Sequence, residues 1–191
     1  MKQIISLFLG ILFCMSMQAQ TAISEYVNSH GQSFNVSLLI KNDKPYRVSL
    51  ACEAKGGDGQ IWIKPSDVGK FRDALVSLKS KFEEWDKTAK ENNVKEANKD
   101  MPIKFPKVEF VWGISTRFFA DAAFKAKWFL SSPVEFVLCM APITASNNQF
   151  AKETFTIRFY SIQDVQSLID ALNQDKIDAA IKTTENSNLF K

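Results

Sequence analysis

His30 is the only histidine of the chain, so a Ser-His-Asp or Cys-His catalytic group would have to use this one residue. It stands beside Gly31, close to the start of the sequence, where a solvated loop histidine is the simpler interpretation. A zinc site would need several histidine and cysteine ligands at close spacing, and Cys52 and Cys139 are far apart in the sequence. We therefore predict no catalytic residue, no metal site and no cofactor.

A glycine-rich segment and two pairs of aspartates are weaker candidates for chemistry. Residues 56–59, Gly-Gly-Asp-Gly, could cradle a phosphate, but they lack the GxxxxGK[ST] spacing and lead into a strand, so they predict a hairpin tip. The pairs Asp67/Asp73 and Asp164/Asp170 could suggest general acid–base work, but at these spacings they point in different directions on a helix. The first aspartate of each pair is instead expected at a helix start.

Aromatic and basic residues alternate on predicted strands. The strand 124–130 turns its two lysines and Phe129 to one face, and 155–160 does the same with Arg158 and Tyr160. If these faces coincide, aromatic rings lie among cations, as in surfaces that stack bases and neutralise phosphates. We favour the alternative that the cations solvate a sheet whose aromatics are covered by a loop or a partner. The candidate ligand face comprises Trp62, Lys125, Lys127, Phe129, Arg158 and Tyr160.

The two cysteines that follow the N-terminal segment can be compared by strand alternation. Aligning Leu50 with Leu138 places Cys52 and Cys139 on opposite faces of equivalent strands. We therefore expect two free cysteines, although a bridge between them stays open.

A long amphipathic helix is predicted from Asp67 to about residue 91. Pro65 and Ser66 precede Asp67, whose side chain would cap the helix and whose charge suits the positive end of the helix dipole. The apolar residues recur at steps of three and four and so form one stripe: Val68, Phe71, Leu75, Leu78, Phe82 and Trp85. The stripe would either cover the chain's own sheet, which we favour, or form the seam of a homo-oligomer.

A second amphipathic helix is predicted after residue 160. Ser161 and Asp164 form a capping-box pattern at its start. The apolar phase is lost after Leu172, so we expect a break near Asn173 and Gln174.

The two helices follow similar sets of strands. Strand-like alternation occurs at 22–27, 34–40, 45–50, 61–64, 108–114, 124–130, 133–138 and 155–159, and tight turns are predicted at 42–43 and 131–132. The helix start DVGKFRDAL (67–75) also returns as DVQSLIDAL (164–172). We predict an α+β fold of two ββββα repeats, about 22–92 and 107–183, whose antiparallel sheets are covered by two amphipathic helices. A charged linker, 87–106, would join them.

This plan resembles that of the Whirly and Pur-alpha group, whose repeat is four antiparallel strands followed by a helix. The resemblance spans about residues 22–181 and is carried by element order and by the segments IWIKPSDVGKFRDAL and FTIRFYSIQDVQSLIDAL. It implies a duplicated, Whirly-like fold and binding of single-stranded nucleic acid.

Residues 1–20 predict a secretory signal peptide, with one lysine, a short apolar run and small or polar residues at the end. The run is too short to span a membrane, and residues 21–191 would form one exported domain, periplasmic or secreted. The net charge of the full sequence is only +3, so global charge does not indicate a polyanionic partner.

These features favour an exported, non-enzymatic binding or interaction module whose ligand or protein partner the sequence does not identify. The alternative is a single-stranded nucleic-acid-binding protein that uses the candidate ligand face. An enzyme is the least favoured class.

Overall fold

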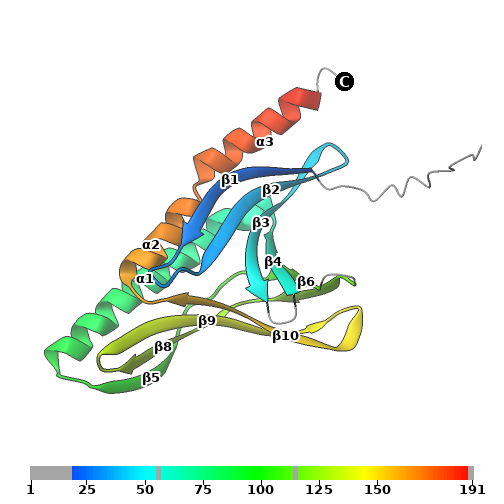
Figure 1. The fold of residues 1–191 in the computed structure, drawn as a ribbon. Coiled ribbons are helices and arrows are strands. Elements are labelled where there is room, and N and C mark those ends of the chain that lie inside the picture. Colours follow the sequence, from blue (N-terminus) through cyan, green and yellow to red (C-terminus); the bar gives the residue numbers. More distant parts are fainter. Residues whose placement is uncertain (1–18, 55–56, 114–115, 189–191) are drawn as a thin grey trace, which may run out of the picture.

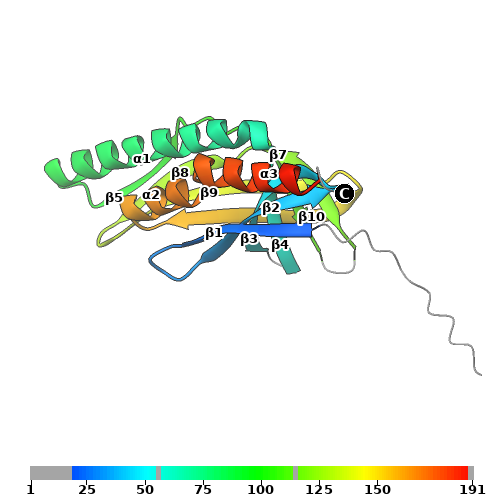
Figure 2. The ribbon, with the colours of Figure 1, turned by 90° about the horizontal axis from the view of Figure 1, so that it is seen from above.

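A computed structural model describes residues 19–54, 57–113 and 116–188, and therefore leaves out nearly all of the expected signal peptide. Over these residues the chain is a mixed α+β protein with ten strands in two antiparallel sheets and three α-helices. In Figure 1 sheet A stands above sheet B, and Figure 2 shows the helices gathered on one side of the strands. Ala19 and Gln20, expected at the end of the signal peptide, already pair within the first strand.

Sheet A has the strand order β1-β2-β3-β4-β6-β7. Its first four strands form a meander in sequence order, and its last two come from the second half of the chain. Asn42 and Asp43 link β2 to β3 with positive φ values of 51° and 59°, which confirms the predicted tight turn. The strands are β1 (Ala19–Val27), β2 (Ser33–Lys41), β3 (Lys44–Ala54), β4 (Gly57–Ile63), β6 (Val108–Trp112) and β7 (Phe118–Ala122).

Sheet B has the order β10-β9-β8-β5. Its strands are β5 (Glu96–Met101), β8 (Lys125–Ser131), β9 (Val134–Ala145) and β10 (Asn148–Phe159). Its inner face meets sheet A through aromatic rings, since Phe110 of β6 lies 4.8 Å from Phe155 and 5.3 Å from Phe124, centroid to centroid. The two sheets therefore share one core.

Helix α1 (Val68–Glu91) confirms the predicted long helix. The first five residues of its stripe are at most 2% exposed, and Trp85 is half-buried against Trp128 of β8. The stripe is thus used to cover the chain's own sheets. The helix ends as Asn93 takes a φ of 51° and the Val94 amide donates to the Ala89 carbonyl, a common way to stop a helix.

The second helical region is broken where the sequence predicted. Helix α2 (Ile162–Ala171) packs against α1 and β1, and α3 (Gln174–Asn188) follows after two residues that are not helical. The Ser161 hydroxyl accepts from the Asp164 amide, which is one half of the predicted capping box. The Asp164 carboxylate does not complete the box. It accepts instead from Ser29 and from the Tyr160 amide.

The predicted side-chain cap at Asp67 is wrong. A short 3₁₀ turn, η1 (Pro65–Asp67), leads into α1, and the Asp67 carboxylate makes no capping bond. It pairs with Lys70 at 2.9 Å instead, one turn along the exposed side of the helix.

Two strands, β5 and β7, were not predicted from the sequence. Residues 96–101, expected within a charged linker, form the edge strand β5 of sheet B, and residues 118–122 form the edge strand β7 of sheet A. The second half of the chain therefore contributes six strands, divided over two sheets, where four were expected. Strand β5 gives little hydrophobic signal because four of its six side chains are exposed.

Cys139 is a free thiol on the core face of sheet B and is 1% exposed. The predicted opposite placement of the two cysteines came from aligning Leu50 with Leu138, but Leu50 faces the core and Leu138 lies on the outer face. The cause is a register shift that adds Tyr46 to β3 and moves the alternation by one residue relative to β9. The side chain of Cys52 lies outside the described residues.

Candidate functional site

Five of the six residues of the candidate ligand face lie together on the outer face of sheet B. Strand register places Lys127 opposite Leu138, which in turn lies opposite Arg158, so these side chains form one row across three strands. Phe129 lies two residues beyond Lys127 on the same face of β8, opposite Phe136, and Tyr160 follows the end of β10. In Figure 1 the helices lie on the other side of sheet B, and no helix of the described chain covers this face.

Four aromatic rings cross this face, a set that we call the ring row: Phe129, Phe136, Tyr160 and His30. Phe129 stacks on Phe136 with centroids 4.9 Å apart and planes 17° apart. Phe136 lies 6.0 Å from Tyr160, and Tyr160 stacks on His30 at 3.5 Å. The row thus runs from β8 across β9 and β10 to the loop between β1 and β2. Stepwise rings at such spacing are platforms on which planar groups can stack.

Four basic and two acidic side chains share the outer face of sheet B: Lys125, Lys127, Lys152, Arg158, Glu96 and Asp100. Lys127 pairs with Asp100 at 3.4 Å, and its Nζ lies 5.9 Å from the centre of the Phe129 ring. The Arg158 guanidinium lies 5.9 Å from the centre of Phe136. Both distances are within reach of a cation–π contact, so the face combines rings with a net positive charge.

A hydrogen-bond network fixes the end of the ring row. Asp164, 5% exposed, accepts from the Ser29 amide at 2.9 Å, the Ser29 hydroxyl at 3.0 Å and the Tyr160 amide at 2.8 Å. Asn28 donates to the Arg158 carbonyl at 3.0 Å, which ties the same loop to β10. These bonds hold His30 against Tyr160, because the loop has partners in both β10 and α2.

The geometry around His30 differs from that of a catalytic triad. In a triad the histidine lies between the nucleophile and the acid. Here the Ser29 hydroxyl lies between them, with 3.0 Å to the Asp164 carboxylate and 3.3 Å to Nδ1 of His30. The hydroxyl proton thus has a carboxylate acceptor already, and nothing in this arrangement orients the imidazole as a base.

Trp62 lies apart from the other five residues, on sheet A. Together with Leu39 and Val111 it forms a small second cluster on the face of sheet A that points away from the shared core. It is 7% exposed, and its indole nitrogen donates to Gln60 at 2.7 Å. Trp62 therefore does not share a face with Lys127 and Phe129, because β4 and β8 belong to different sheets.

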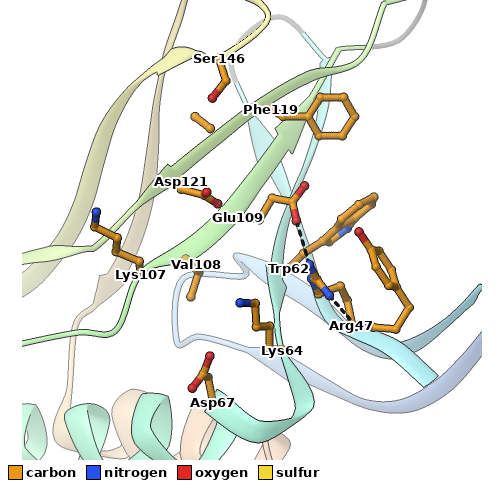
Figure 3. Close-up of a pocket in the computed structure, with 12 residues that line it drawn as sticks. Arg47, Trp62, Lys64, Asp67, Lys107, Val108, Glu109, Phe119, Asp121 and Ser146 are labelled. Atoms are coloured by element: carbon orange, nitrogen blue, oxygen red, sulfur yellow. Dashed lines mark hydrogen bonds and ion pairs between the residues drawn. The ribbon is translucent and has the colours of Figure 1, made fainter. Parts of the chain in front are cut away.

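Beside Trp62 is an open cavity of about 520 Å³, which we call the Trp62 hollow (Figure 3). Tyr46 and Phe119 contact the Trp62 ring edge-on, at 6.1 and 6.4 Å between centroids. Arg47 lies over the Tyr46 ring at 4.1 Å and pairs with Glu109 at 3.5 Å. The hollow therefore has an aromatic wall with charged groups along its rim.

Phe136, at the centre of the ring row, and the contact of His30 with Tyr160 were not among the residues predicted from the sequence. Phe136 directly precedes Val137 of the core face, and the alternation of β9 could have placed it beside Phe129. No local pattern could have joined His30 to Tyr160, because that contact depends on the distant acceptor Asp164.

Two buried groups lie behind this face, in the core. Burial raises the pKa of the Cys139 thiol above its usual range, which keeps it neutral. Burial also raises the pKa of Tyr26, and the nearby Asp164 carboxylate adds to the effect. Among the described residues no group of three His, Cys, Asp or Glu side chains is placed to hold a metal ion.

Comparison of the chain with protein-family models, with curated proteins and with solved structures finds no match. Within the part of the chain that the structure describes, no helix has the length and apolar character needed to cross a membrane.

Proposed function

We propose that this chain is an exported, non-enzymatic binding module and that the outer face of sheet B is its binding surface. The ring row with its neighbouring cations is the observation that carries the proposal. Exposed or half-buried rings in one row, flanked by Lys125, Lys127 and Arg158, suit recognition of planar or anionic groups. The position of Ser29 between His30 and Asp164 further supports a role without catalysis.

A substrate screen tests the non-enzymatic part of this proposal. The chain and a His30→Ala variant are assayed with chromogenic esters, phosphates, glycosides and peptides, after circular dichroism has shown that both are folded. We expect no turnover above buffer from either protein. Turnover that disappears in His30→Ala would overturn the proposal, since this is the only histidine of the chain.

Single-stranded nucleic acid is the second candidate for the ligand. The specific observation in its favour is that the rings follow one another across three strands, so that successive bases could stack on successive rings. Lys125, Lys127 and Arg158 lie close enough in register to meet the phosphates of the same strand. Each stacked base would contribute about 1 to 3 kcal/mol.

Titration of a labelled oligothymidine, single-stranded and in a duplex, tests this candidate. We expect single-strand binding whose logarithmic salt slope flattens by about 0.7 for each lysine lost in Lys125→Gln/Lys127→Gln. Phe136→Ala should weaken binding at every salt concentration, because it breaks the ring row. The matched control is Lys87→Gln/Lys182→Gln, which removes the same charge from exposed positions on α1 and α3. Equal loss in the control would show that the outer face of sheet B is not the binding site, and no binding at low salt would exclude nucleic acid as the ligand.

We further propose that the fold of this chain derives from duplication of a Whirly-like unit of four strands and a helix. The first unit would be β1 to β4 with α1, and the second β5, β8, β9 and β10 with α2. In each sheet these four strands are neighbours in sequence order, and the β6–β7 hairpin would be an insertion that pairs with β4. The repeated helix start at 67–75 and 164–172 agrees with this division.

A further inference from the structure

The charged side chains of the Trp62 hollow are not all paired. Three basic and three acidic residues line it: Arg47, Lys64, Lys107, Asp67, Glu109 and Asp121. Arg47 pairs with Glu109, and Asp67 pairs with Lys70 outside the hollow. Lys64, Lys107 and Asp121 are exposed, and none of them has an ion-pair partner among the described residues. Two cations and one carboxylate are therefore available to a ligand.

The strand register brings these three groups to one place. Trp62 lies opposite Glu109, and Glu109 lies opposite Asp121 on the next strand. Lys64 directly follows β4, and Lys107 directly precedes β6, so both leave the paired strands at the end nearest η1. In Figure 3 Lys64 and Asp121 lie beside the open space, and Lys107 lies at its far edge with its ammonium directed away from Lys64.

The aromatic wall favours a neutral or anionic ligand over an amine. Lys41 and Arg47 already lie over the Tyr46 ring, at 5.3 and 4.1 Å from its centre. A ligand ammonium at this wall would meet these like charges, whereas a ring with an apolar face would not. The fixed orientation of Trp62, held by Gln60, keeps the wall in place when the hollow is empty.

We infer that the Trp62 hollow binds a sugar acid, that is, a short saccharide with one carboxylate. The carboxylate would meet Lys64 and Lys107, hydroxyl groups would donate to Asp121, and the sugar ring would pack toward the aromatic wall. The volume of about 520 Å³ falls in the range of about 300 to 1,000 Å³ that small-ligand sites occupy. The Trp62 hollow is separate from the outer face of sheet B, so the proposal for one site can be disproved while the proposal for the other stands.

The test follows the indole signals of the full chain by NMR, with the tryptophans labelled with ¹⁵N. A Trp62→Phe variant assigns the Trp62 signal, and D-glucuronate, D-glucose and L-glutamate are titrated to millimolar concentration. We expect D-glucuronate to shift the Trp62 signal and to leave those of Trp85 and Trp128 unchanged. Lys64→Gln and Lys107→Gln should each weaken binding about tenfold, as expected for loss of one charge-assisted hydrogen bond.

Lys104→Gln is the matched control, because Lys104 is exposed three residues before Lys107 but does not line the hollow. It should bind D-glucuronate as the unaltered chain does. The inference is overturned if the Trp62 signal does not move, if D-glucose or L-glutamate binds as tightly as D-glucuronate, or if the control weakens binding equally. The oligothymidine titration reports on Lys125, Lys127 and Phe136 instead, so the two results are distinguishable.

Discussion

At the scale of single residues, the core contains a polar atom that the fold does not satisfy. Tyr26 is 1% exposed, and within the described part of the chain its hydroxyl has no hydrogen-bond partner. Its ring lies between Phe34 at 5.6 Å and Phe159 at 6.4 Å. A buried hydroxyl without a partner loses its hydrogen bonds to water and gains none in the protein. The Tyr26 hydroxyl therefore lowers the free energy of unfolding by about 1 to 3 kcal/mol.

Tyr26→Phe is therefore expected to leave the free energy of unfolding unchanged or to raise it by about 1 kcal/mol. Urea unfolding followed by circular dichroism measures the change. Phe34→Leu serves as the comparison, because it alters the volume of the same packing site and should destabilise by about 1 kcal/mol. If Tyr26→Phe destabilises as much as Phe34→Leu, the hydroxyl has a partner, such as a bound water.

At the scale of elements, the end of α1 is attached to sheet B by a cluster that responds to pH. The Trp128 indole donates to Glu135 at 2.6 Å, and its ring packs against Trp85 of α1. Burial raises the pKa of Glu135, the neighbouring Asp86 carboxyl raises it further, and the Trp128 bond opposes both. The folded chain therefore holds this proton more tightly than the unfolded chain does.

Because the pKa of Glu135 is higher in the folded chain than in the unfolded chain, protonation of Glu135 stabilises the fold, and this stabilisation is present at low pH. It is lost as the pH rises from about 4.5, the ordinary value for Glu, through the folded pKa. Glu135→Gln should remove this part of the pH dependence and stabilise the chain near neutral pH, because the amide oxygen still accepts from Trp128. Urea unfolding on both sides of the titration checks it. Glu185→Gln, at an exposed position on α3, should leave the pH profile as it was.

At the scale of the whole molecule, α1 and the two sheets share one hydrophobic core. Phe71 is fully buried and contacts Phe105 and Phe124, and Trp85 at the other end contacts sheet B. We expect a single unfolding transition, with circular dichroism and tryptophan fluorescence coinciding. Phe71→Ala should lower the free energy of unfolding by about 3 to 5 kcal/mol and shift both signals together. Two separate transitions would show that the sheets are independent.

The sequence predicted elements with strong periodicity and missed those that depend on partners. The stripe from Val68 to Trp85 and the eight alternating strands are local patterns, and all were found. Strand β5 is polar because it joins sheet B through its backbone while most of its side chains face solvent. Asp67 pairs with Lys70, whereas the sequence predicted that it would cap the helix. At the candidate site, alternation grouped Lys125, Lys127 and Phe129 correctly. Which sheet each strand joins is set by tertiary pairing, so Trp62 was misplaced.

Because β6 and β7 complete sheet A from the second half of the chain, sheet A stays incomplete during much of synthesis. A nascent chain emerges from its N-terminus, so β1 to β4 and α1 are complete before any strand of sheet B has left the ribosome. Until β8 arrives, Trp85 has no Trp128 to pack against, and the free edge of β4 waits for β6. The half-made protein thus presents an apolar helix face and an open strand edge, the two features that holding chaperones recognise and that aggregation exploits.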